Sequence, residues 1–287
     1  MPELPEIEIV KRSLFKMANK AKIKKIIINN RNLRYKIPSL FSKQLIGQKI
    51  LKISRRSKYL IFHFKKKLLL AHFGMSGKML ILRSGDRKIL KTSFYYDLNY
   101  KKKHNHVYFK LNNGLVLIYN DVRRFGFFKL YNTTEINKIT FLNKLGPEPF
   151  NKGFSVNYFK KSIKNIKKNI KNLLMDQSFV SGLGNIYVNE ALFMTRIIPT
   201  RRCFNLNKNE IENLIKNIRK ILKLSISKGG SSISDFKNTE GKSGNFQQFF
   251  YVYGRENEEC SRISCKGKVQ KIKISNRSSF YCDKCQN

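Results

Sequence analysis

The chain has 287 residues and a net charge of +41, from 59 lysines and arginines against 18 acidic residues. Its 41% hydrophobic and 12% aromatic content is typical of a folded protein with a sizeable core, and its length suits two domains. No apolar run approaches the ~18 residues of a membrane span, and the acidic N-terminus lacks the basic region of a signal peptide, so we expect a cytoplasmic protein. The charge favours a nucleic-acid partner, with a membrane surface as the weaker alternative, although A+T-rich coding also enriches lysine.

The chain begins with Met1, Pro2 and Glu3. Removal of the initiator Met would expose the secondary amine of Pro2, which can attack an electrophilic carbon and form a cationic imine. Pro5 suits the first turn of a helix, and apolar residues then recur at helical spacing. The alternative is that Pro2 has no chemical role and that the glutamates only complement the helix dipole.

Residues 22–132 contain short β-rich runs separated by turns. Residues 107–111 and 115–119 alternate around Asn113-Gly114, which is a strong hairpin signal. Residues 50–54 and 59–64 predict a second hairpin with a basic tip at residues 55–58, and runs at 68–71 and 79–82 bracket a loop at residues 72–77. This pattern predicts an all-β sandwich or barrel capped by the N-terminal helix.

Two loops of this region carry residues that suit DNA. Asp121-Val122-Arg123-Arg124-Phe125-Gly126 places two guanidinium groups beside an aromatic ring, and Met75 lies between Gly74 and Gly77. Such loops can contact bases or phosphates and insert an apolar wedge into a duplex. Taken singly, each is better explained by a core side chain next to a surface charge.

After residue 133 the pattern becomes helical. Gly146-Pro147-Glu148-Pro149 marks a linker, a stripe from Val156 to Ile170 predicts one helix, and Asn207 with Glu210 predicts the capped start of another. Gly182 and Gly184 precede a predicted helix. The N-terminus of this helix could bind a phosphate, and the alternative is that the glycines only form a tight turn between two helices. The Ser-, Gly- and Asn-rich segment 231–248 is expected to be a mobile loop.

Four of the five cysteines lie near the C-terminus with the spacing C-x4-C-x16-C-x2-C, at Cys260, Cys265, Cys282 and Cys285. Two closely spaced thiolate pairs predict a structural zinc site with no ligand position left for water, and disulfides are the alternative. Short strands at 269–274 and 279–281 indicate a β-hairpin zinc ribbon with Arg277 near its tip. Cys203 lies far from the others in sequence and is expected to be an ordinary small residue.

These motifs together resemble the formamidopyrimidine-DNA glycosylase family, the bacterial helix-two-turns-helix enzymes that remove oxidised purines. The resemblance covers the whole chain and rests on MPELPE, SRRSKYL, HFGMSG, DVRRFG, LGPEP, GLGNIYVNE, VYGR and the terminal cysteines. It implies an α+β fold: a helix-capped β-sandwich domain (1–132), a linker (133–153), a helical helix-two-turns-helix domain (154–248) with the mobile loop, and the zinc ribbon (249–287).

The resemblance also implies roles for individual residues. Pro2 is expected to attack the sugar and Glu3 to transfer protons, while Lys58 and Arg277 assist β- and δ-elimination. Base-flipping enzymes must fill the space left in the duplex, and the remaining expected DNA contacts are Met75, His104, Arg123, Arg124, Phe125, Asn185 and Tyr253. The expected partner is double-stranded DNA with oxidised bases or abasic sites, bound by a monomer associated with the bacterial nucleoid, with one structural zinc ion and no catalytic metal.

Three positions depart from the family pattern: the first cysteine pair is C-x4-C rather than C-x2-C, Asn105 replaces an acid, and Ser234 stands where some members carry lysine. Two alternatives stay open from the sequence. One is an endonuclease VIII-like glycosylase for oxidised pyrimidines, although Leu4 and the RRFG loop favour the purine branch. The other is a non-catalytic basic zinc-ribbon protein, which would not need Pro2 and Glu3.

Overall fold

The computed structural model describes residues 2–85, 89–90, 101–231 and 245–287. The chain forms two compact units, Met1–Asn143 with Lys228–Asn245 and Lys144–Ser227 with Phe246–Asn287. Ser234 and most of the predicted mobile loop lie outside the described residues, whereas residues 245–249 form a short 3-10 helix, η4 (Asn245–Phe249).

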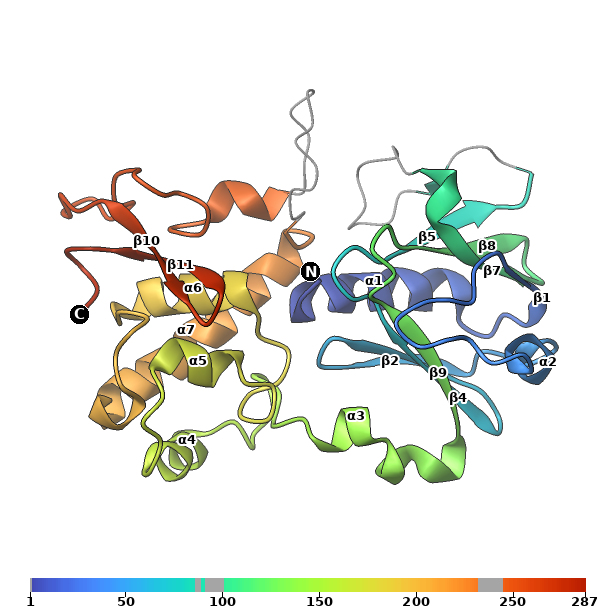
Figure 1. The fold of residues 1–287 in the computed structure, drawn as a ribbon, viewed down its shortest axis with the longest axis horizontal. Coiled ribbons are helices and arrows are strands. Elements are labelled where there is room, and N and C mark those ends of the chain that lie inside the picture. Colours follow the sequence, from blue (N-terminus) through green and yellow to red (C-terminus); the bar gives the residue numbers. More distant parts are fainter. Residues whose placement is uncertain (1, 86–88, 91–100, 232–244) are drawn as a thin grey trace. The chain divides into compact units, whose positions relative to one another are not determined.

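The first unit is built on two antiparallel sheets (Figure 1). The five-stranded sheet has the order β1-β7-β8-β5-β6, from β1 (Ile23–Ile28), β7 (Asn105–Leu111), β8 (Leu115–Asn120), β5 (Lys78–Arg83) and β6 (Ile89–Leu90). The four-stranded sheet has the order β2-β3-β4-β9, from β2 (Lys52–Arg56), β3 (Tyr59–His63), β4 (Lys67–His72) and β9 (Phe127–Asn132). The predicted hairpin at Asn113-Gly114 is confirmed, with Phe109 opposite Leu117.

One apolar core joins both sheets and helix α1 (Leu4–Ala18). The predicted helical stripe of Ile7, Val10, Leu14 and Ala18 is buried, and α1 packs against β2 and β3. Shorter elements complete this unit: α2 (Phe41–Leu45), η1 (Lys102–His104), η2 (Thr133–Lys138) and α3 (Thr140–Asn143). The helix-capped β-sandwich is therefore confirmed.

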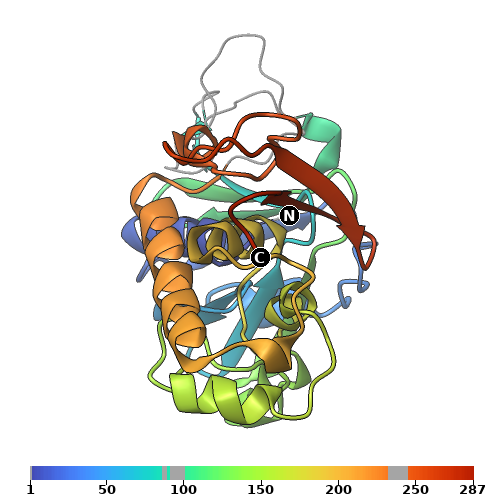
Figure 2. The same ribbon diagram turned by 90° about the vertical axis from the view of Figure 1, so that its left-hand side faces the viewer.

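The second unit is helical with one hairpin. It contains α4 (Val156–Ile163), α5 (Ile170–Met175), α6 (Asn185–Thr195), η3 (Cys203–Asn205), α7 (Lys208–Ser227), β10 (Val269–Ile274) and β11 (Arg277–Cys282). Helix α6 packs against α7, and β11 packs against α6 (Figure 2). Among the described residues, no helix is both long enough and apolar enough to cross a membrane.

Two predictions for these elements need correction. The stripe from Val156 to Ile170 is two helices, because Asn169 caps a new helix by accepting a hydrogen bond from Asn172 N at 2.8 Å. The basic hairpin tip is also shorter than expected: Arg55 and Arg56 belong to β2, and the turn is Ser57-Lys58. By contrast, the Asn207–Glu210 capping pair is confirmed, with reciprocal hydrogen bonds of 2.8 and 2.9 Å.

Candidate functional site

The N-terminus is held by carboxylates at the start of α1. Pro2 is half-buried immediately before the helix, while Glu3 and Glu6 are buried. Glu6 accepts a hydrogen bond from Glu3 N at 2.8 Å, and its other oxygen accepts from Ser231 N and Ser231 Oγ, both at 3.0 Å. Glu6 thus fixes the backbone next to Pro2 and ties it to the residue that begins the predicted loop.

Lys58 is presented by a two-residue turn. Ser57 has a φ of 56°, and Lys58 is only 6% exposed. Arg55 donates to Ser57 O and to Glu8 of α1, each at 3.0 Å, so the turn is tied to the N-terminal helix. Burial alone would raise the pKa of Glu8, but hydrogen bonds from its cationic neighbours Lys11, Arg55 and Arg12 bring it below the ordinary value.

Two loops cross between the sheets and carry the predicted DNA-contacting residues of this unit. The Met75 loop (residues 73–77) joins β4 to β5, and the Arg123 loop (residues 121–126) joins β8 to β9. Met75 and Phe125 are each 44% exposed, and the Arg123 guanidinium lies 4.8 Å from the centre of the Phe125 ring. The exposed Arg124 has a φ of 58°, and His104 accepts a backbone hydrogen bond from Asp121 N at 3.1 Å.

His72 is a residue of this region that the sequence did not single out. Its ring lies 5.0 Å from Tyr59 and 5.5 Å from Phe127, and its Nδ1 accepts a hydrogen bond from Gly74 N at 3.2 Å. Burial, with smaller contributions from Lys58 and Arg34, lowers the pKa of His72 to about 4. The imidazole is therefore a neutral acceptor at neutral pH that shapes the start of the Met75 loop.

In the second unit, Asn185 and Arg277 belong to one polar cluster. Asn185 at the start of α6 donates to Ser278 O at 2.9 Å, and Lys171 donates to the same carbonyl at 3.0 Å and to Ser279 Oγ at 2.5 Å. Burial, and then the nearby Arg277, lower the pKa of Lys171 to about 7. Lys171 is therefore a second residue that the sequence did not reveal.

Arg277, the first residue of β11, is exposed and lines a pocket of 320 Å³ beside this cluster. Lys168 and Lys171 line the same pocket. Asp176 lines the pocket as well and pairs with Lys168 at 3.5 Å, so Arg277 and Lys171 are the basic groups of this depression that pair with no carboxylate of the described residues.

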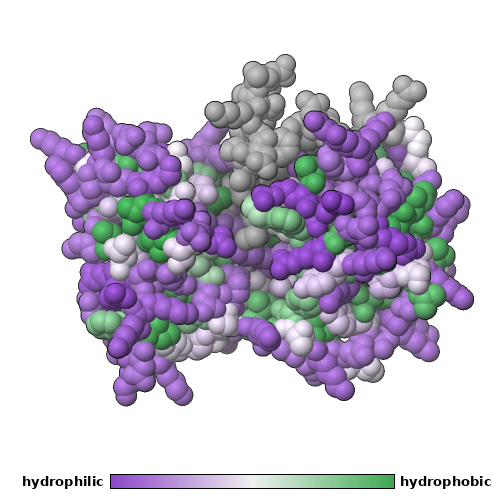
Figure 3. Space-filling view, in the orientation of Figure 1, coloured by the Kyte–Doolittle hydropathy of each residue, from purple (hydrophilic) through white to green (hydrophobic). Residues whose placement is uncertain are grey.

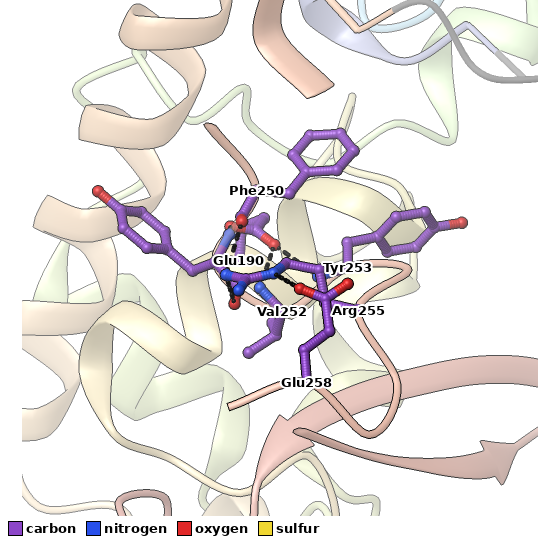
Figure 4. Close-up of polar contacts among 7 residues, drawn as sticks. Glu190, Phe250, Val252, Tyr253, Arg255 and Glu258 are labelled. Atoms are coloured by element: carbon purple, nitrogen blue, oxygen red, sulfur yellow. Dashed lines mark hydrogen bonds and ion pairs between the residues drawn. The ribbon is translucent and has the colours of Figure 1, made fainter. Parts of the chain in front are cut away.

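Tyr253 lies in a segment whose backbone is held by Glu190 (Figure 4). The fully buried Glu190 carboxylate of α6 accepts hydrogen bonds from Tyr251 N (2.8 Å), Val252 N (3.1 Å) and Tyr253 N (2.9 Å). Burial raises the pKa of Glu190, and the three amide donors oppose that shift. Arg255 closes the segment by donating to Tyr251 O at 3.0 Å and to Glu258 at 2.7 Å.

The four C-terminal cysteines converge. Their sulphur atoms all lie within 4.8 Å of one another, with 3.8 Å between the sulphurs of Cys260 and Cys285 and 3.6 Å between those of Cys265 and Cys282. Four thiols at these separations could hold one metal ion, so the C-x4-C spacing does not prevent a four-ligand site. Cys203 is buried elsewhere and is not part of the cluster.

The sequence-predicted residues thus fall into two groups. The first unit carries Pro2, Glu3, Lys58, Met75, His104, Arg123, Arg124 and Phe125, and the second carries Asn185, Tyr253, Arg277 and the four cysteines. The face drawn in Figure 3 is largely hydrophilic, with apolar surface in separate small areas, as the charge of the chain predicts.

Comparison with known proteins identifies the family. Residues 1–128 match the formamidopyrimidine-DNA glycosylase N-terminal domain, and residues 145–237 match the H2TH domain of the same enzymes. The chain belongs to the formamidopyrimidine-DNA glycosylase family. It is 44% identical to the formamidopyrimidine-DNA glycosylase of Bartonella tribocorum, with full coverage of both chains, and 42% identical to that of Rickettsia conorii, with 100% and 99% coverage.

Solved structures agree with this assignment. A Lactococcus lactis formamidopyrimidine-DNA glycosylase variant in complex with Fapy-dG-containing DNA has a TM-score of 0.87 and 35% identity, with full coverage of both chains. The Lactococcus lactis enzyme in complex with abasic-site DNA gives 0.86 and 35%, with 99% coverage of each chain. The chain is therefore a DNA glycosylase of base excision repair, and neither the pyrimidine-specific nor the non-catalytic alternative is favoured.

Proposed function

We propose that this member of the formamidopyrimidine-DNA glycosylase family removes oxidised purines, namely 8-oxoguanine and formamidopyrimidines, from duplex DNA and then cleaves the strand. The observation that best supports the proposal is the Pro2 terminus, followed by the buried Glu3 and fixed by Glu6. The L. lactis relatives bound to Fapy-dG and abasic-site DNA support the same substrate class. Because DNA is the substrate, we infer that the protein acts in the bacterial cytoplasm at the nucleoid.

In the proposed mechanism the Pro2 nitrogen attacks the sugar C1′, the bond from C1′ to the damaged base breaks, and the base leaves with a proton. Glu3 assists sugar opening and proton transfer. The resulting secondary-amine imine is a cation, so a C2′ proton becomes acidic. Loss of this proton expels the 3′ phosphate as the 3′ C–O bond breaks. A second elimination breaks the 5′ C–O bond and expels the 5′ phosphate, which leaves a one-nucleotide gap. Lys58 and Arg277 serve these two eliminations.

We assign the remaining residues to DNA contact. Met75, Arg123 and Phe125 fill the space left by the extruded nucleotide, with Arg123 facing the orphaned base, and the stacking of Arg123 on Phe125 supports a shared position. Phosphate contacts are assigned to His104, Arg124, Asn185 and Tyr253. In this scheme residues 1–132 form the catalytic domain, 133–153 the linker, 154–248 the helical domain and 249–287 the ribbon.

We further propose that the four cysteines hold one structural zinc ion. Zinc–thiolate bonds of ~2.3 Å in a tetrahedron place the sulphurs roughly 3.8 Å apart, which agrees with the 3.6 and 3.8 Å separations. With four protein ligands no position remains for water or substrate, so the ion would fold the ribbon and place Arg277 rather than join the reaction.

Borohydride trapping tests the mechanism. Zinc-loaded protein with Met1 removed is mixed with a duplex containing 8-oxoguanine opposite cytosine, and reduction is expected to give a covalent complex with the DNA attached to Pro2 in peptide mapping. The matched control is the same chain with a short N-terminal extension, which should bind the duplex but form no adduct. An adduct at a lysine, or no adduct with the trimmed protein, would contradict the proposal.

A further inference from the structure

The Met75 loop and the Arg123 loop lie side by side because both of their ends are paired. His72, which precedes the Met75 loop, is opposite Phe127, which follows the Arg123 loop. At the other end, Lys78 is opposite Asn120. The two loops are therefore adjacent crossings from one sheet of the sandwich to the other.

A single carboxylate joins the two crossings. Asp121 is fully buried, and its Oδ1 accepts a hydrogen bond from Ser76 Oγ of the Met75 loop at 2.5 Å. Its Oδ2 accepts from Gly126 N of the Arg123 loop and from Tyr119 Oη, each at 2.9 Å. Ser76 Oγ in turn accepts from Arg123 N at 3.0 Å. One buried acceptor thus fixes backbone or side-chain groups in both loops.

The backbones of the loops are also in direct contact. A Cβ atom on Gly74 would lie 2.5 Å from Phe125 C and 2.6 Å from Gly126 N, and Gly74 has a φ of 60°. A Cβ atom on Gly126 would overlap Tyr119 Oη and lie 2.6 Å from His72 O. Because no side chain fits between the loops, a shift of one must move the other.

The chemistry of the cluster suits a carboxylate. The three groups that contact the Asp121 side chain all act as donors, and a carboxylate accepts on both oxygens. In an Asp121→Asn variant the amide oxygen would keep the donors Gly126 N and Tyr119 Oη, and the NH2 group would face Ser76 Oγ. Ser76 would then have to accept from the amide as well as from Arg123 N and turn its own proton away, so the hydrogen bond from Ser76 to a carboxylate is lost while the shape of the side chain is kept.

We propose that Asp121 is a positioning residue that makes Met75 and the Arg123–Phe125 pair enter the DNA as one rigid unit. This inference rests on the proposed function, because it assumes that these side chains replace the flipped nucleotide. Within these two loops, which the structure describes in full, the Asp121 carboxylate is contacted by Ser76 and Gly126 and not by the exposed side chains that we assign to DNA. The carboxylate acts at the base of both loops, and its effect reaches DNA only through them.

The test uses a duplex with 2-aminopurine opposite the 8-oxoguanine, because its fluorescence reports restacking when side chains fill the space. Asp121→Asn is expected to lower kcat/KM on this duplex by about 10- to 100-fold, as expected for loss of a hydrogen bond to a charged group, and to diminish the fluorescence change. A single-stranded abasic oligonucleotide has no space in a base stack to fill, so the rate of borohydride trapping of Asp121→Asn on it should stay within about 3-fold of the wild-type rate. Glu212→Gln, an exposed carboxylate on α7, is the control and should behave as wild type.

Two further measurements separate positioning from general stability. In a double-mutant cycle, Met75→Ala should cost less in the Asp121→Asn background than in wild type, because both changes disable the same unit. If Asp121→Asn does not fold, Ser76→Ala takes its place and Ser76→Thr, which keeps the hydroxyl, should restore activity. Additive effects, or an unchanged fluorescence response with kcat/KM within 2-fold of wild type, would overturn the inference. Failure of wild type itself to be trapped would instead count against the proposed function.

Discussion

At the scale of single residues, a half-buried imidazole and a buried carboxylate fix the backbone beside residues that we assign to DNA contact or catalysis. His72 accepts the Gly74 amide at the start of the Met75 loop, and Glu6 accepts the Glu3 amide beside Pro2. These acceptors touch backbone rather than exposed side chains. Their substitution should therefore alter geometry before it alters surface chemistry.

The lowered pKa of His72 predicts a pH-dependent stability. Its folded pKa of about 4 lies below its ordinary value of 6.5, so between these pH values the unfolded chain binds a proton that the folded chain does not. This contribution to stability is present above pH 6.5 and is lost as the pH falls toward 4. Between pH 7.5 and 5, wild type should lose about 2 kcal/mol more unfolding free energy than His72→Asn, whose amide oxygen can accept from Gly74.

Urea unfolding followed by circular dichroism at the two pH values measures this difference. His63→Asn serves as a comparison, because burial also lowers the pKa of His63 but its ring is hydrogen-bonded to Ser54 of β2 rather than to the Met75 loop, so this variant shows how much pH dependence a histidine outside the loop contributes. Parallel pH profiles for wild type and His72→Asn would show that folding does not lower the pKa of His72.

At the scale of elements, helices hold functional segments through buried polar side chains. Glu190 of α6 fixes residues 251–253, Asn189 of the same helix accepts from Phe280 N at 2.8 Å, and Lys171 of α5 holds the β10–β11 hairpin near Arg277. The hairpin is thus positioned by side chains from two helices as well as by the cysteine cluster.

Loss of the Lys171 contacts should change the products of the reaction. Lys171→Met removes two of the hydrogen bonds to the hairpin and leaves the one from Asn185 to Ser278 O, so Arg277 should be placed less well and the second elimination should slow. We expect the single-elimination product to accumulate several-fold relative to the one-nucleotide gap, measured on a labelled abasic duplex by denaturing electrophoresis. Lys168→Met is the matched control, because this exposed lysine lines the same pocket but pairs with Asp176 at 3.5 Å. An equal product ratio in both variants would show that Lys171 does not position Arg277 for the second elimination.

The C-x4-C segment also has a structural use. Arg262, inside this segment, donates to Phe193 O at 2.8 Å, and its guanidinium lies 4.7 Å from the centre of the Phe193 ring. Arg262 therefore anchors the cysteine end of the hairpin to the C-terminal end of α6.

Local patterns predicted the hairpin at Asn113-Gly114 and the C-terminal hairpin, whereas they left a sandwich or a barrel open and the sandwich followed from the family resemblance. The sequence missed His72 and Lys171 because their significance lies in burial and partners far away in sequence: Lys171 reaches Ser278 across 107 positions. The sequence also predicted one helix where the structure has α4 and α5, because the apolar spacing continues across Asn169, which caps the second helix. Asn105, which stands where the family usually has an acid, accepts a hydrogen bond from Asn120 at 2.7 Å and donates one to Tyr108 at 2.9 Å.

At the scale of the whole molecule, the charge of +41 predicts a strong salt dependence of DNA binding. If about six phosphates are neutralised, affinity should fall ~10³-fold or more between 50 and 200 mM salt, because bound counterions are released on association. Fluorescence anisotropy with a duplex bearing an uncleavable abasic analogue measures the slope. Arg124→Gln should reduce its magnitude by about one.

A flat salt response would show that most of the lysines are a consequence of coding bias and do not contact phosphate. Lys16→Gln at the end of α1, which lies outside every predicted DNA contact, is the control and should leave the slope unchanged.

The backbone contact between Gly74 and the Arg123 loop also limits how this enzyme can be redesigned. Substitutions of the exposed Met75, Arg123 or Phe125 side chains leave the buried contacts between the two loops unchanged. They are therefore the reasonable route to a new opposite-base preference. Insertions, deletions or grafts within one loop would instead have to be matched by a compensating change in the other. Libraries that vary both loops together should therefore yield more folded, active variants than libraries that vary either loop in length alone.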